Sequence, residues 1–129
     1  MIENTIANWH EIVQSRDPSG LDALLHDDAV FHSPVVHMPQ KGKHITRMYL
    51  TAAFQVLFSE DFSYVREIVG DRDAVLEFTT TIDGITVNGV DLISWGDDGR
   101  ITDFKVMLRP LKAVNLIHQK MAEMLQKAS

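Results

Sequence analysis

The sequence predicts an α+β protein in which helices come first and a strongly curved antiparallel sheet follows, with the helices on its concave face. Apolar residues recur at a helical period as far as residue 57. From Phe62 onward the period changes to two, and β-branched and aromatic residues become frequent. The dipeptide Asp83-Gly84 then gives a strong hairpin-turn signal between two alternating segments. Together these three observations predict the class.

Helical spacing of apolar residues predicts four helices. The first has one stripe made of Ile2, Ile6, Trp9 and Val13. After a break at residues 17–20, Ser19 is expected to cap a short leucine-rich helix. A second long helix is predicted from the face Ile45, Met48, Tyr49, Ala52, Val56 and Leu57. Pro110 suits the first position of a terminal helix, whose inner stripe would be Leu111, Val114, His118, Met121 and Leu125.

The strands are predicted from alternation and from turn residues. Residues 29–33 are expected to form a short strand and residues 34–43 a loop. Residues 74–82 alternate strictly, and Gly89 is interpreted as a bulge or a close backbone approach inside the next strand. A turn at residues 96–99 leads to a strand over 100–109. Without repeats, linkers or low-complexity segments, one domain over residues 1–129 is expected.

Composition excludes several classes of protein. The net charge of −6 and the lack of a basic run argue against nucleic-acid binding. No apolar run approaches the roughly 20 residues of a membrane span. Neither the basic nor the apolar segment of a signal peptide is visible at the start, so we expect a cytoplasmic protein. The absence of cysteine excludes disulfides, thiolate metal sites and cysteine nucleophiles.

A curved sheet that helices cover only in part has a cone-shaped cavity, a natural small-molecule site. Asp91 shares a predicted strand face with Val87, Ile93 and Trp95, so its carboxyl group is expected in an apolar cleft. Such acids are often tuned for proton transfer or hydrogen-bond donation. The alternative is a structural aspartate that binds a backbone amide or a helix side chain.

Other residues are expected around the same cavity. His37 is a candidate general acid or base at its mouth, or otherwise an ordinary loop histidine. Trp9 would line or fill the cavity, Ser33 would hydrogen-bond a ligand or the backbone, and His118 would be a core histidine. The remaining expected lining residues are Phe31, Phe78, Ile93 and Phe104.

Six histidines raise the question of a metal. His32, His37 and His44 are close in sequence, but they fall across a strand, a loop and a helix start. Their spacing matches no recognised ligand pattern, so neither a metal nor another cofactor is expected.

Three segments carry a family resemblance. Residues 21–34, LDALLHDDAVFHSP, resemble the segment after the first helix in SnoaL-like and ketosteroid-isomerase-like proteins of the nuclear transport factor 2-like superfamily. Gly42-Lys-His-Ile45, which opens a helix, and residues 90–101, VDLISWGDDGRI, are similar to that family as well. The resemblance implies the cone-like sheet of this superfamily, also called a cystatin-like roll.

The resemblance also implies candidate roles. Ketosteroid isomerases use a carboxylate base beside an oxyanion hole made by a tyrosine and a protonated acid. Asp91 matches the protonated acid, whereas Trp9 stands at the tyrosine position and Ser33 at the base position. Two of three positions depart, so a steroid isomerase is not expected. An acid–base enzyme, a non-catalytic pocket for a small apolar or carbonyl-bearing ligand, and a dimeric interaction domain remain open.

The outer face of the sheet predicts a homodimer. Val90 and Leu92 lie on it, and so does Met107 between Lys105 and Arg109. Such an apolar face favours burial against a second copy. The alternative is a monomer whose last helix covers these residues.

Overall fold

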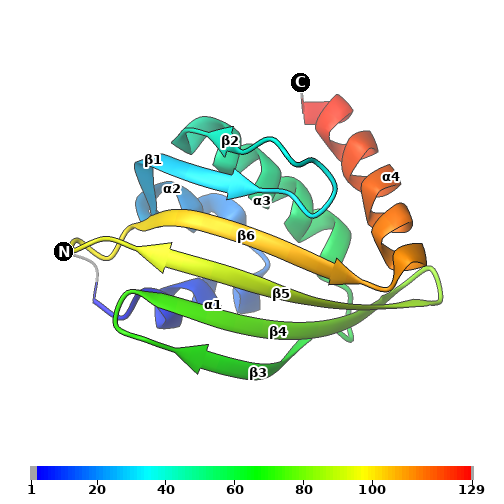
Figure 1. Cartoon of the computed structure of the whole chain (residues 1–129), viewed down its shortest axis with the longest axis horizontal. Helices are drawn as coiled ribbons and strands as arrows, with labels where there is room; N and C mark the ends of the chain where they lie inside the picture. The colour runs from blue at the N-terminus through cyan, green and yellow to red at the C-terminus, as the bar shows by residue number, and fades with distance from the viewer. Residues whose placement is uncertain (1–2, 129) are drawn as a thin grey trace.

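The computed structural model describes residues 3–128, so Ile2 of the expected first stripe lies outside the described residues. The elements follow the expected order of helices, strands and a last helix (Figure 1). Their bounds in chain order are α1 (Thr5–Ser15), the short 3₁₀ helix η1 (Pro18–Gly20), α2 (Leu21–Leu24), β1 (Leu25–His32), β2 (Gln40–Lys41), α3 (Lys43–Leu57), β3 (Ser63–Val69), β4 (Asp73–Ile82), β5 (Ile85–Trp95), β6 (Ile101–Arg109) and α4 (Leu111–Ala128). Within the described range, no helix is long and apolar enough to span a bilayer.

All six strands form one sheet in the order β2-β1-β6-β5-β4-β3. The α+β class and the curved sheet are confirmed, but the sheet is mixed, because β1 runs parallel to β6. The expectation of a wholly antiparallel sheet is therefore wrong at this pair. Short turns force the consecutive strands β3 to β6 to run antiparallel. No such turn joins β1 to β6, since His32 and its neighbour Asp103 are 71 residues apart.

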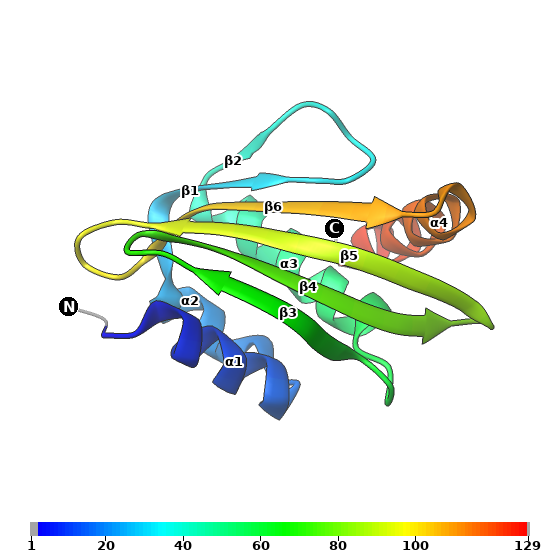
Figure 2. The same cartoon turned by 60° about the horizontal axis from the view of Figure 1, so that its bottom comes forward.

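The helices lie on one side of the sheet, as Figure 2 shows for α1, α3 and α4. Trp9 of α1 and Phe54 of α3 pack with Phe104 of β6 in the larger core cluster. Ala113 and Ile117 of α4 pack with Phe78 in the smaller cluster. The expected inner stripe of α4 is wrong, since Leu111 is 75% exposed and His118 is exposed. The helix packs against both α3 and the ends of β5 and β6, which turns Ala113 and Ile117 inward.

Two further details of the helices differ from expectation. Ser19 is not a cap: the carboxylate of Asp17 accepts the Ser19 amide hydrogen and caps η1, and α2 begins after Gly20 without a side-chain cap. The buried face of α3 is rotated from the predicted one and consists of Thr46, Leu50, Ala52, Phe54, Val56 and Leu57.

β1 begins at Leu25, four residues before the predicted start at Ala29. Leu25 is fully buried and pairs with Ile101, and the pairing is then interrupted until Val30. This irregularity leaves Asp27 and Asp28 exposed inside the strand, and such an acidic pair lacks the alternation that would have placed the start of β1 before Ala29. Residues 40–41 of the predicted loop form β2, which pairs with β1.

The strand pattern of the sheet is otherwise confirmed. Alternate residues of β4 are buried, namely Ala74, Leu76, Phe78, Thr80 and Ile82. Asp83 and Gly84 have φ values of 51° and 77°, as a tight primed turn requires. Gly89 lies inside β5 in regular pairing with Phe78 and Leu108, so the structure shows the close approach and not the bulge.

Candidate functional site

Three polar side chains form a hydrogen-bonded chain inside the fold. The indole Nε1–H of Trp9 donates to the hydroxyl of Tyr64 at 2.9 Å. That hydroxyl donates to Oδ2 of Asp91 at 2.7 Å. These two hydrogen bonds therefore link α1, β3 and β5.

Local structure explains why these side chains converge. Trp9 lies on the buried stripe of α1. Asp91 lies on the inward face of β5, between the buried residues Gly89 and Ile93. Tyr64 pairs with Phe78 just before a bulge, and after the bulge β3 is exposed along its length. The bulge thus lets an edge strand direct a single aromatic hydroxyl inward.

Burial shifts the proton equilibria of both acidic groups. Asp91 is 6% exposed. Burial raises its pKa to about 7, and the hydrogen bond from Tyr64 opposes the rise only in part. The pKa of Tyr64 is held well above its ordinary value by its own burial and then by the nearby charge of Asp91. Asp91 therefore changes its charge near neutral pH, and Tyr64 keeps its proton.

The direction of the two hydrogen bonds decides which oxygen of Asp91 carries a proton when the acid is neutral. An indole nitrogen only donates hydrogen bonds, so Tyr64 accepts from Trp9 and has its own proton for Asp91. Oδ2 of Asp91 is therefore always an acceptor. Tyr64 engages Oδ2 and leaves the other oxygen, Oδ1, on the side of the carboxyl group that this bond does not use. The neutral acid consequently has its O–H at Oδ1, free for a ligand.

Asp91 borders a small inner cavity of about 20 Å³. That volume holds one water-sized group. Apart from Asp91, its walls are apolar or aromatic: Trp9, Leu50, Ala53, Phe54, Leu57, Phe58, Phe62, Phe78, Phe104 and Val106. An acid with a free donor in such a site is suited to binding a carbonyl or oxyanion.

A larger outer groove of about 130 Å³ lies between α3, α4, β6 and the loop after β1. Most of its walls are apolar, including Phe31, Leu108, Ile117 and Met121. Its polar side chains are Ser33, Tyr49 and His118, of which the Ser33 hydroxyl already accepts the amide hydrogens of Val35 and Val36.

The structure divides the residues that the sequence assigned to a site. Trp9, Phe78 and Phe104 lie with Asp91 at the inner cavity, and Phe31 and Ser33 line the outer groove. Ile93 is buried in the core without bordering either space. His37 is exposed in the loop after β1 and borders neither of the two cavities.

Sequence reasoning missed two residues of the site. Tyr64 gave no signal, because β3 lacks clear alternation and the bulge is invisible in the sequence. His118 was interpreted as a core histidine, and that interpretation is wrong, since it is exposed and borders the outer groove. Its spacing on α4 is the same as that of a core residue, so no local pattern distinguishes its groove-facing position from a buried one.

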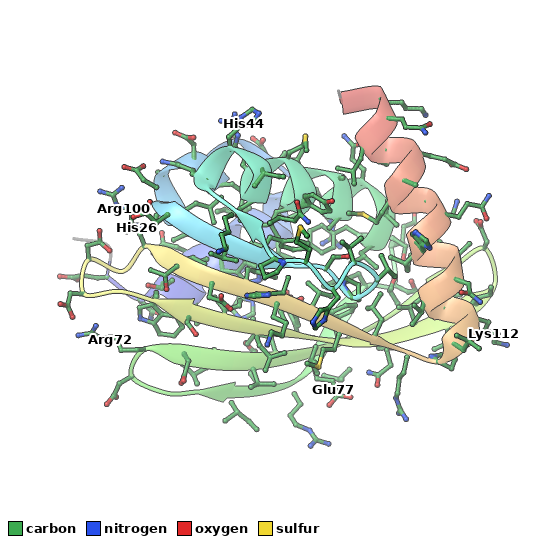
Figure 3. All side chains as sticks on the ribbon, turned by 45° about the horizontal axis from the view of Figure 1, so that its top comes forward. His26, His44, Arg72, Glu77, Arg100 and Lys112 are labelled. Carbon is green, nitrogen blue, oxygen red and sulfur yellow. The ribbon has the colours of Figure 1, made fainter. Side chains whose placement is uncertain are left out.

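The histidines do not converge. His32 pairs with Asp103 at 2.8 Å, and His44, in the first turn of α3, lies apart from His26 of β1 (Figure 3). Across residues 3–128, no group of three histidine, aspartate or glutamate side chains has the geometry of a metal site.

Comparisons with known proteins agree with this architecture. The sequence profile of the SnoaL-like domain matches residues 6–104. A steroid delta-isomerase from Pseudomonas aeruginosa has a similar structure, with 39% identity, a TM-score of 0.91, and coverage of 96% of this chain and 90% of that one. An uncharacterised protein with a cystatin-like fold from Silicibacter pomeroyi has 32% identity, a TM-score of 0.86, and coverage of 95% and 85%. An NTF2-like protein from Mesorhizobium loti, at 20% identity, a TM-score of 0.71, and coverage of 82% and 88%, shares the fold. The comparison with curated proteins finds no match.

Proposed function

The chain belongs to the SnoaL-like domain family, and from that premise we propose that it is an acid–base enzyme of the isomerase type. Its ligand would be a small, largely apolar molecule with a carbonyl group. The resemblance found in the sequence is confirmed by the family match and by the NTF2-like neighbours.

One observation carries the proposal: Asp91 is a buried acid that borders an apolar cavity, and the hydrogen bond that it receives from Tyr64 engages Oδ2 and not Oδ1. When neutral, it donates a hydrogen bond from Oδ1 to the carbonyl oxygen of the ligand. That bond strengthens as negative charge develops on the oxygen, so it favours the transition state over the ground state.

In the proposed reaction, a proton leaves the carbon next to the carbonyl, and an enolate forms. The hydrogen bond from Asp91 stabilises the enolate oxygen. The same base then returns the proton to the far carbon of the conjugated system, and the double bond moves without net change in composition. We assign the base to His118, because it is the titratable side chain that borders the outer groove other than a tyrosine.

This proposal predicts graded effects at Asp91. The probe is conversion of a β,γ-unsaturated cyclohexenone to its conjugated isomer, followed by ultraviolet absorbance. Asp91→Leu removes the donor and should lower kcat/KM about a hundredfold or more. Asp91→Asn keeps a weaker amide donor and should lower it about tenfold. The wild type should also lose activity above about pH 7, where Asp91 ionises, while Asp91→Asn should not.

Asp103→Asn is the matched control, since this carboxylate pairs with His32 instead of bordering the cavity. It should leave the rate unchanged. Equal rates in the wild type and Asp91→Leu would count against the proposed role.

A non-catalytic ligand-binding protein is the second candidate. It is favoured by Ser33, at the position where the resemblance to ketosteroid isomerases implies the base, because its hydroxyl already accepts hydrogen bonds from two amides. Saturable, Asp91-dependent binding of the ketone without turnover would identify this alternative.

We propose in addition that the protein is a homodimer. An outer apolar patch is formed by Ile68, Val75, Val90, Leu92 and Met107, which lie on neighbouring strands. Ile68 is 61% exposed and Met107 is 52% exposed. The alternative of a last helix over this face is wrong, because α4 packs on the inner side.

Leu92→Lys should therefore break the dimer, because it places a charge at the centre of the patch. Light scattering after size exclusion should give twice the 14.6 kDa chain mass for the wild type and the chain mass itself for the variant. Leu111→Lys is the control, since Leu111 is 75% exposed at the start of α4. A wild-type mass of one chain at micromolar concentration would refute the dimer.

A further inference from the structure

The inner cavity and the outer groove share part of their walls. Ala53, Leu57 and Val106 border both of them. Two of the three are on α3 and one is on β6, so side chains of these two elements form the partition that separates the two spaces. Ala53 contributes only a methyl group, which makes it the thinnest part.

The two volumes differ in what they can hold. The inner cavity, about 20 Å³, has room for one water-sized group. The outer groove, about 130 Å³, is close to the size of an engineered protein cavity of about 150 Å³ that binds benzene. Pockets for drug-sized ligands are larger, at roughly 300–1,000 Å³.

We propose that the two spaces form one divided site for a ligand of single-ring size. The ring lies in the outer groove, and one oxygen passes the partition beside Ala53 to meet Oδ1 of Asp91. The inference rests on the proposed function and adds the size class of the substrate. It separates this chain from its Pseudomonas aeruginosa neighbour, described as a steroid delta-isomerase, since a fused four-ring ketone would extend out of the groove and leave much of its apolar surface in solvent.

The walls match such a ligand in polarity as well as in size. Phe31 stacks on Tyr49 along one side of the groove, and Met121 and Leu125 of α4 complete the apolar surface. The Ser33 hydroxyl uses its lone pairs for Val35 and Val36, and its proton remains available at the rim beside His118. A ring ketone is apolar except at its polar substituents, so its ring suits the apolar walls and a polar substituent suits the rim.

The experiment is a titration of methyl-labelled protein with a cyclohexenone, a bicyclic decalone and a four-ring steroid ketone. The cyclohexenone should shift the methyl resonances of Ala53, Leu57 and Val106, with at least tenfold weaker binding of the decalone and no such shift with the steroid. Ala53→Leu thickens the partition and should weaken cyclohexenone binding about tenfold or more. Ala53→Gly opens the partition and should reduce the difference in affinity between the cyclohexenone and the decalone.

Ala7→Leu makes the same change on an exposed position of α1 and should leave all affinities unchanged. Steroid binding as tight as cyclohexenone binding, or an unchanged affinity in both Ala53 variants, overturns the inference. If the size class is overturned in this way but Asp91→Leu still abolishes turnover of a larger ketone, the proposed function stands without it. If the protein discriminates ketones by ring size but Asp91→Leu has no effect on turnover, the proposed function is overturned and the divided binding site stands. Failure of every ketone to bind overturns the size class itself.

Discussion

The free energy of unfolding should fall as the pH rises from about 4 to about 7, and then level off. The pKa of Asp91 is about 7 in the folded chain, against 3.8 for an ordinary aspartate. Between these values the folded state holds a proton that the unfolded state has lost, so raising the pH favours unfolding. A difference of about three pKa units corresponds to an effect on the order of 4 kcal/mol.

The surroundings of Asp91 support this sign. The groups that face it within residues 3–128 are aromatic or aliphatic, apart from Tyr64, and none of them is a cation that would stabilise the carboxylate. Tyr64→Phe removes the hydrogen bond that lowers the pKa of Asp91. The pH at which the free energy of unfolding levels off should therefore rise above 7. The exposed Asp61 has a pKa lowered to about 2 by hydrogen bonds from Ser59 and then Thr81, so its stabilisation is lost only below pH 4.

Urea denaturation between pH 4.5 and 8.5 measures the effect. Asp91→Asn should have a nearly flat profile across this range and should be more stable than the wild type at pH 8. Asp28→Asn changes an exposed carboxylate on β1 and should keep the wild-type slope. A wild-type slope in Asp91→Asn would show that another group is responsible.

Gly89→Ala should destabilise the protein by about 3 kcal/mol, because the inner sheet surface has no room for a methyl group there. A Cβ atom would lie 2.5 Å from Cζ of Phe78 and 2.6 Å from Cδ2 of Leu108. It would also lie 2.9 Å from the backbone oxygen of Met107, which cannot rotate away. Both side chains belong to residues that pair with Gly89 across the sheet.

The same substitution at Gly96 provides the control. A Cβ there meets its nearest atoms at 3.8 Å, and the turn should be unaffected or slightly stabilised. Thermal and urea unfolding of both variants should separate them clearly. Equal stability of Gly89→Ala and Gly96→Ala would mean that the sheet relaxes around the added methyl.

The sequence was most informative where one physical rule acts alone. In β4, one face is buried and the other meets solvent, so alternation gives the burial of Leu76 and Phe78 directly. The Asp83-Gly84 turn and the inward face of Asp91 follow from equally local rules. The prediction of Asp91 in an apolar cleft agrees with its burial, and the family resemblance that pointed to it is confirmed.

Prediction failed where an element has two partners. α4 packs on α3 and on the sheet together, so its buried face is set by Ala113 and Ile117 and not by the longest apolar stripe. Tyr64 reaches the site through a bulge in an edge strand, which depends on the pairing with β4. The division of the cavity by Leu57 and Val106 depends on side-chain packing across elements, and no local pattern encodes it.

The parallel pairing of β1 with β6 has a consequence for how the chain acquires its structure. His32 meets Asp103 across 71 residues, so β1 gains this neighbour only after almost the whole meander exists. Closing so long a loop precedes any gain from the pairing, which places this contact late and slows folding. During synthesis at 5–20 residues per second, β1 waits roughly 4 to 14 seconds for β6. The short strand β2, which follows β1 after the loop 33–39, pairs with Val30 and Phe31 and so covers that part of the edge of β1 during the interval.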